Sequence, residues 1–141
     1  MHRALVFYQQ AWEQRRIELL DECFTEDAVY VFRPPALARP CNGLAEIKRY
    51  WQDRVLSEQE SARFTVLRTV EIGRQLWCEW WAEAAMPMLR PGNDVFSMWG
   101  VMICDLAADG KFKRLVEYYF WDPQQRERLQ KARQSASPNE A

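Results

Sequence analysis

The second half of the chain contains four apolar and aromatic runs separated by turn signals, and this pattern restricts the fold more than any other feature. The runs cover residues 64–72, 76–86, 95–106 and 112–121. Short segments rich in Gly, Pro, Asn and Asp lie between them, and Asp109-Gly110 is a strong hairpin signal. The pattern therefore predicts four consecutive strands in an antiparallel meander.

The first half alternates between helical and strand-like segments. Apolar residues at helical spacing predict two short helices before residue 25 and another over residues 44–56. Residues 29–32 predict a strand closed by Pro34-Pro35, and the polar residues 57–63 predict a loop. Asp122 and Pro123 are suited to begin a polar helix over residues 124–133. We expect one α+β domain over residues 1–134, with a frayed tail over residues 135–141.

Composition and charge narrow the class of protein. Lys and Arg number 19 against 20 Asp and Glu, and no long run of one sign indicates nucleic-acid or membrane binding. The only histidine is His2, and the scattered residues Cys23, Cys41, Cys78 and Cys104 lack zinc-site spacing. Their spacing leaves a disulfide open, although small buried apolar side chains are the simpler interpretation. We expect a cytoplasmic protein with no metal and no cofactor.

Three segments, residues 24–28, 43–51 and 109–123, have the order and spacing of a known superfamily. They resemble the nuclear-transport-factor-2-like superfamily, which includes SnoaL-like polyketide cyclases, ketosteroid isomerases and limonene-epoxide hydrolases. The resemblance implies N-terminal helices packed in the concave face of a curved, mostly antiparallel sheet, a cone-shaped cystatin-like barrel around an apolar cavity. Function diverges widely in this superfamily, so the fold says little about the reaction.

The catalytic positions of ketosteroid isomerase can be carried over one by one. The resemblance places its oxyanion-hole tyrosine on Tyr8, its general base on Phe32 and its protonated aspartate on Met102. Isomerase chemistry needs a carboxylate to move the proton, and neither Phe32 nor Met102 supplies one. This resemblance does not predict ketosteroid isomerase activity.

About half of the catalytic positions of limonene-epoxide hydrolase are retained. Its water-positioning tyrosine falls on Tyr30, but the neighbouring asparagine falls on Phe32. Its Arg–Asp pair falls on Trp80 and Ala82, and its last aspartate falls on Glu117. Because half of the polar set is missing, epoxide hydrolysis is not predicted either.

Strand alternation and helical spacing together predict which side chains face the cavity. Residues with the parity of the family's sites should point inward, and Tyr8, Trp12 and Trp51 should close the cavity from the helices. The predicted lining is aromatic and suits a flat, apolar ligand held by a few polar groups. It consists of Tyr8, Trp12, Tyr30, Phe32, Trp51, Trp80, Met98, Met102, Leu115, Glu117 and Tyr119.

Glu117 is the predicted catalytic acid or base. Burial in an apolar cavity would raise the pKa of its carboxyl, and Tyr8 and Tyr30 would polarise a carbonyl or hydroxyl of the ligand. In the alternative interpretation, Glu117 pairs with Arg68 or Arg114. In a separate alternative, Tyr8 and Tyr30 are buried side chains whose hydroxyls bond to the backbone or to Glu117.

The opposite face of the sheet is predicted to carry Glu79 and Glu83 together with Trp77, Trp81, Trp99 and Tyr118. Exposed aromatic area of this extent favours a homodimer through the outer sheet face, unless the C-terminal helix or long loops cover it. Three functions stay open: an enzyme for isomerase, cyclase or hydrolase-type acid–base chemistry, a non-catalytic binder of a small apolar or aromatic molecule, and a protein-interaction subunit.

Overall fold

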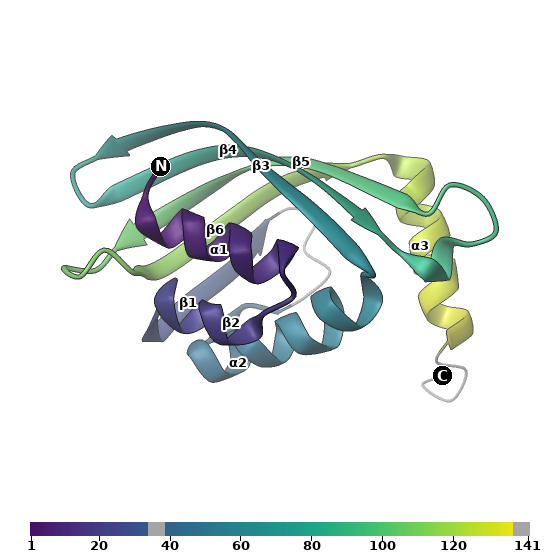
Figure 1. Ribbon diagram of the computed structural model, residues 1–141, viewed down its shortest axis with the longest axis horizontal. Helices are drawn as coiled ribbons and strands as arrows, with labels where there is room; N and C mark the ends of the chain where they lie inside the picture. The colour runs from purple at the N-terminus through teal and green to yellow at the C-terminus, as the bar shows by residue number, and fades with distance from the viewer. Residues whose placement is uncertain (34–38, 137–141) are drawn as a thin grey trace.

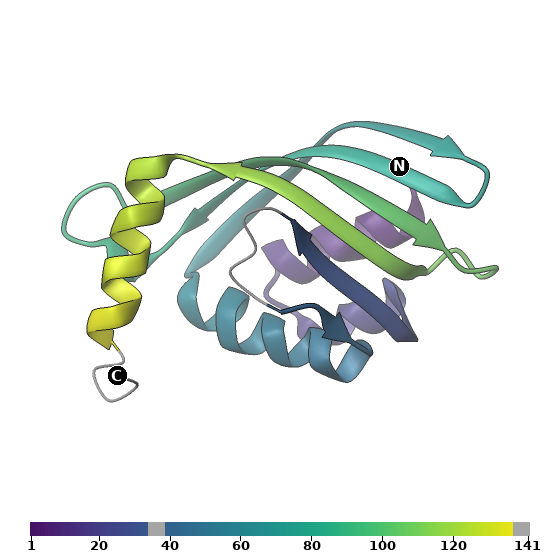
Figure 2. The same ribbon diagram turned by 180° about the vertical axis from the view of Figure 1, so that it is seen from behind.

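A strongly bent six-stranded sheet holds the helices α1 (Arg3–Glu13) and α2 (Leu44–Tyr50) in its concave face (Figure 1). The structure is a computed structural model that describes residues 1–33 and 39–136. A third helix, α3 (Pro123–Ala136), crosses one end of the sheet (Figure 2). In the described part of the chain, no helix is long and apolar enough to cross a membrane.

The sheet order is β2-β1-β6-β5-β4-β3, so its two edges stay open. Neighbouring strands are antiparallel except for β1 and β6, which run parallel. The predicted α+β class, the curved and mostly antiparallel sheet and the C-terminal meander are confirmed. The strands are β1 (Phe24–Arg33), β2 (Cys41–Asn42), β3 (Ser61–Ile72), β4 (Gln75–Ala85), β5 (Val95–Leu106) and β6 (Phe112–Trp121).

Several element boundaries differ from the sequence prediction. β1 begins at Phe24, because Phe24 pairs with Phe112 on β6 even though polar residues 25–27 interrupt the apolar pattern. The second predicted helix is a 3₁₀ segment, Ile17–Glu22, and β3 begins at Ser61 inside the predicted loop. The predicted end of β1 at Pro34-Pro35 lies outside the described residues.

The helix predicted over residues 44–56 is present but changes geometry along its length. After α2, the chain continues as a wider π-helical stretch, Trp51–Leu56. α3 extends to Ala136, beyond the predicted residues 124–133, and it includes Ser135 and Ala136 of the predicted tail. Its buried Leu129 packs in a small second core with Met86, Leu89 and Phe96. This apolar anchor holds a helix whose sequence is otherwise polar.

The main core lies between the concave face and the helices. Tyr8 makes edge-on contacts with Trp51 and Phe64, at ring-centroid distances of 5.3 and 5.5 Å. Gly100 on β5 lets the neighbouring strands approach closely, since a Cβ there would collide with the Tyr118 carbonyl oxygen and lie 2.9 Å from the Trp80 ring. The four cysteines are buried and free.

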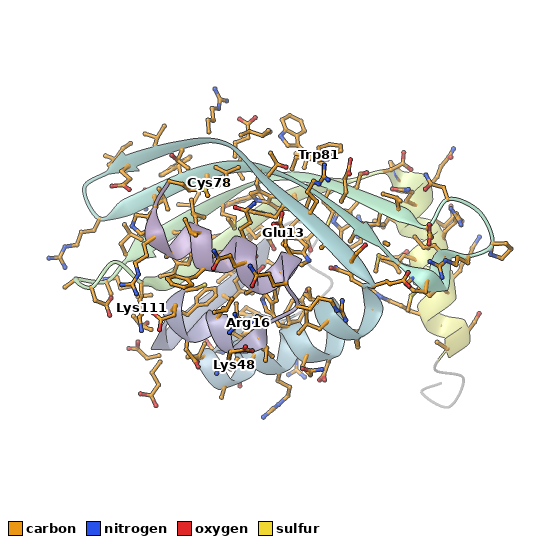
Figure 3. All side chains as sticks on the ribbon, in the orientation of Figure 1. Glu13, Arg16, Lys48, Cys78, Trp81 and Lys111 are labelled. Atoms are coloured by element: carbon orange, nitrogen blue, oxygen red, sulfur yellow. The ribbon has the colours of Figure 1, made fainter. Side chains whose placement is uncertain are left out.

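The convex face carries a row of exposed aromatic side chains. Trp81, Trp99 and Phe120 occupy paired positions on β4, β5 and β6, and all three are exposed. Figure 3 shows Trp81 on this side, away from the helices. Phe120 was not predicted to belong to this row. Neither α3 nor a described loop buries these side chains.

Candidate functional site

A partly enclosed cavity of about 80 Å³ lies between the concave face and the helices, at the end of the sheet crossed by α3. β1, β4, β5 and β6 form one wall, and α1, the end of α2, the π-helical stretch and α3 form the other. The lining residues are Tyr8, Trp12, Tyr30, Tyr50, Trp51, Arg54, Val55, Gln59, Trp80, Met86, Phe96, Met98, Glu117, Tyr119, Trp121, Leu129 and Arg133.

The volume limits what this conformation can hold. An apolar protein cavity of about 150 Å³ is known to take up benzene, roughly twice the volume available here. A ligand of one aromatic ring or more therefore requires side chains at the cavity mouth to move aside.

The structure brings most of the predicted lining residues together. Tyr8, Trp12, Tyr30, Trp51, Trp80, Met98, Glu117 and Tyr119 line the cavity. Phe32, Met102 and Leu115 are buried but do not line it. Strand parity put them on the correct face, but Phe32 packs against Tyr50 and Leu115 lies farther along β6 from α3 than Glu117 does. Met102 pairs with Glu117 across β5 and β6, but its side chain is part of the filled main core.

Sequence reasoning missed several lining residues, above all those of the cavity mouth. Tyr50, Arg54 and Val55 follow the inner face of the helix predicted over residues 44–56, so their spacing was an available signal. Leu129 and Arg133 are one turn apart on α3, the usual spacing for side chains on one helix face. A predominantly polar helix gave no reason to place them at a cavity.

Glu117 is held inside the cavity by a chain of two phenols. The Tyr30 hydroxyl donates to Glu117 Oε2 at 2.7 Å, and the Tyr8 and Tyr30 oxygens are 3.4 Å apart. Because the single Tyr30 proton is used on the carboxylate, Tyr8 must be the donor to Tyr30 when Glu117 is ionised. Both phenols are thus satisfied within the protein, as the alternative interpretation of the sequence had it.

Burial dominates the acidity of Glu117. Its side chain is 6% exposed, and desolvation raises the pKa of the carboxyl from 4.5 to about 7, against the lowering effect of the Tyr30 hydrogen bond. The alternative partners are engaged elsewhere, since Arg68 pairs with Glu79 and Arg114 with Asp105. Burial, followed by the charge of Glu117, likewise raises the pKa of Tyr30. Glu117 can therefore exchange a proton near neutral pH.

Three indole N–H groups that border the cavity are buried without a hydrogen-bond partner in the described part of the chain. They belong to Trp51, Trp80 and Trp121. A buried donor without an acceptor costs free energy, so such groups are rare in folded proteins. The fourth indole at the cavity, Trp12, is satisfied, because it donates to the Gln59 side-chain oxygen at 2.6 Å.

Two arginines and one glutamate form the mouth of the cavity. Arg54 is 55% exposed and Arg133 is 27% exposed, whereas Glu58 between them is only 8% exposed. Arg133 donates from Nε to Glu58 Oε2 at 2.8 Å, and its Nη2 forms an ion pair with the same oxygen at 2.8 Å. Arg54 donates to Glu58 Oε1 at 3.2 Å. The ion pair with Arg133 fixes α3 to the end of the π-helical stretch.

Comparison with known proteins places the sequence in a family. The profile of the SnoaL-like domain family matches residues 5–115, which is most of the chain. A comparison with curated proteins found no match.

Solved structures share the fold at low sequence identity. A putative SnoaL-like polyketide cyclase from Shewanella denitrificans has a TM-score of 0.69 at 16% identity, covering 91% of this chain and 95% of that chain. A hypothetical protein from Catenulispora acidiphila with a ketosteroid isomerase-like fold, in complex with trimethylamine, has a TM-score of 0.68 at 16% identity, covering 82% and 83%. TerC, co-crystallised with polyporic acid, has a TM-score of 0.69 at 18% identity, covering 89% and 94%.

Proposed function

The chain belongs to the SnoaL-like domain family, and on this premise we propose that it is a cofactor-independent enzyme that transfers a proton within a small carbonyl compound. The observation that carries the proposal is the buried carboxylate of Glu117, which borders the cavity and has a pKa of about 7. A carboxylate with a pKa near the working pH is suited to both taking up and returning a proton.

In the proposed reaction, Glu117 removes a proton from the carbon next to the carbonyl group. The electron pair of the broken C–H bond moves onto the carbonyl oxygen, and the resulting enolate is stabilised by a donor of the cavity wall. The unpaired indole N–H groups of Trp80 and Trp121 are candidates for that donor. Glu117 then returns the proton to the same or another carbon, so no external reactant is consumed.

Tyr30 has a positioning role in this proposal. Its hydrogen bond fixes one oxygen of Glu117, and no hydrogen bond to the other oxygen, Oε1, is found in the described part of the chain. The structural likeness to a putative polyketide cyclase and to TerC with polyporic acid supports an oxygenated, ring-containing substrate. A ligand of that size requires the cavity mouth to open.

Solvent exchange tests the proposal without knowledge of the natural substrate. Small ketones and aryl ketones are incubated with the protein in D₂O, and ¹H NMR follows the loss of the proton next to the carbonyl. We expect exchange with the wild type and its loss with Glu117→Gln. The control is Glu79→Gln, on the convex face. Exchange that continues unchanged with Glu117→Gln contradicts the proposal.

A second candidate function is binding without turnover. It is supported by the internal hydrogen bonds of Tyr8 and Tyr30, which leave neither phenol proton free for a ligand. In that case the ketones that bind show no exchange, and Glu117→Gln has little effect on their affinity. Truncation of Trp80 should then weaken binding by a few kcal/mol, as for central aromatic contacts.

A further inference from the structure

The polar groups at the cavity are mostly hydrogen-bond donors. Trp51 and Trp80 are each 1% exposed, and with Trp121 they supply three buried N–H groups that have no acceptor in the described part of the chain. Gln59 gives its side-chain oxygen to Trp12, which leaves the amide nitrogen as another donor. A complementary ligand must therefore present acceptors, such as carbonyl or carboxylate oxygens.

The mouth of the cavity also presents hydrogen-bond donors, and these donors are positively charged. Arg54 and Arg133 both line the cavity, and among residues 1–33 and 39–136 both form their ion pair with the carboxylate of Glu58. Two guanidinium groups against one carboxylate leave one positive charge at the entrance. Guanidinium groups present paired N–H donors in the geometry that carboxylates accept.

The Glu117 carboxylate and the Arg133 guanidinium share two phenols of the cavity as neighbours. Tyr50 and Tyr119 both line the cavity, and each lies close enough to Glu117 and to Arg133 for both charges to act on its pKa, in opposite directions. A molecule bound in the cavity therefore has both the acid–base group and the arginines among its neighbours.

We propose that the ligand is a small carboxylic acid in its ionised form, whose carboxylate binds Arg54 and Arg133 in place of the Glu58 carboxylate. Combined with the proposed proton transfer, on which this extension rests, the substrate is a keto acid whose carbonyl group lies toward Glu117. The indole N–H groups of Trp80 and Trp121 donate hydrogen bonds to its remaining oxygen atoms.

Glu58 acts as the internal competitor of the ligand in this arrangement. Its carboxylate contacts both arginines and ties α3 over the cavity through Arg133. A ligand carboxylate that takes over Arg133 releases this tie. The cavity mouth can then widen, which the volume of about 80 Å³ requires for a ring-containing molecule.

The proposal is tested by binding of matched carboxylates and amides. Propionate is compared with propionamide and benzoate with benzamide, at one pH and one salt concentration, by tryptophan fluorescence and calorimetry. We expect each carboxylate to bind at least about tenfold more tightly than its amide, as charge-assisted hydrogen bonds predict. If neither carboxylate binds better than its amide, the proposal is wrong.

Variants that each remove one charge test whether the ligand carboxylate binds at Arg54 and Arg133. Arg54→Gln and Arg133→Gln should each weaken carboxylate binding by roughly tenfold and leave amide binding unchanged. Glu58→Gln should strengthen carboxylate binding, because it removes the competing carboxylate. Arg49→Gln removes an exposed charge from α2 and should change nothing. Equal carboxylate affinity in all four variants contradicts the proposal.

The result of the carboxylate-binding measurements does not depend on whether the protein is an enzyme. Binding needs no turnover, so a failed carboxylate preference leaves the exchange test of Glu117 untouched. Conversely, Glu117→Gln should retain the preference for carboxylates even though it abolishes exchange. If circular dichroism shows that Arg133→Gln does not fold, Glu58→Gln and Arg54→Gln still test whether the ligand carboxylate binds at the arginines.

Discussion

Replacing Glu117 with glutamine should remove a pH dependence from the stability of this protein. Glutamine keeps the shape of the side chain and still accepts the hydrogen bond from Tyr30, but it carries no charge at any pH. The substitution therefore isolates the free energy of burying the ionised carboxylate.

The expected magnitude follows from the pKa of Glu117, which is 4.5 ordinarily and about 7 in the folded protein. The folded state binds this proton more tightly than the unfolded chain, so the free energy of unfolding falls as the pH rises from 4.5 to 7 and stays low above that range. Each pKa unit is worth about 1.4 kcal/mol, which makes the full loss about 3 kcal/mol. Glu117→Gln should therefore be more stable than the wild type above pH 7 by up to this amount.

Urea unfolding followed by tryptophan fluorescence measures this difference. The free energies of wild type and Glu117→Gln are compared at several pH values from 4.5 to 8, and subtraction cancels the groups that titrate alike in both proteins. Glu71→Gln, which removes an exposed carboxylate from β3, controls for the loss of one negative charge. A wild-type-minus-variant difference that stays constant across this range would refute the reasoning.

Three further substitutions test other parts of the structure. Tyr30→Phe removes the hydrogen bond that lowers the pKa of Glu117 in the folded protein, so the fall in stability, which still begins near pH 4.5, should extend to higher pH in the same urea assay; an unchanged upper limit would contradict the contact. Gly100→Ala places a Cβ against the Tyr118 carbonyl oxygen and the Trp80 ring, and we expect a loss of about 3 kcal/mol or more by urea unfolding, whereas wild-type stability would show that β6 is not packed so closely. We expect the wild type to sediment as a dimer through the convex face and Trp99→Asp as a monomer; a monomeric wild type would contradict this assignment of the exposed aromatic row.

The sequence predicted the sheet well because its signals are local. Turn residues such as Asp109-Gly110 and β-branched or aromatic runs mark the meander directly. The start of β1 was not predictable in this way, since Phe24 joins the sheet only through its pairing with Phe112. The same holds for β2, whose two residues pair with Val29 and Tyr30 and have no strand pattern of their own.

The sequence predicted the lining residues that lie on the sheet but not those at the mouth of the cavity. Strand alternation places Trp80 and Glu117 on the concave face, and both border the cavity. Alternation assigns a face of the sheet but cannot say which side chains of that face border a cavity, which is why the prediction included Met102, a residue of the filled core. Arg54 and Arg133 come from two helices whose relative position depends on tertiary packing, so no local pattern could bring them together.

The central claim is that Glu117 is a buried acid–base group that exchanges its proton near neutral pH. The most direct measurement is a ¹³C NMR titration of the protein with labelled glutamate side chains, in which the Glu117 carboxyl resonance is identified by its absence from Glu117→Gln. We expect a titration midpoint of about 7 for this resonance. A midpoint near 4.5 would contradict it, because the carboxylate would then be ionised throughout the physiological range and unsuited to both taking and returning a proton.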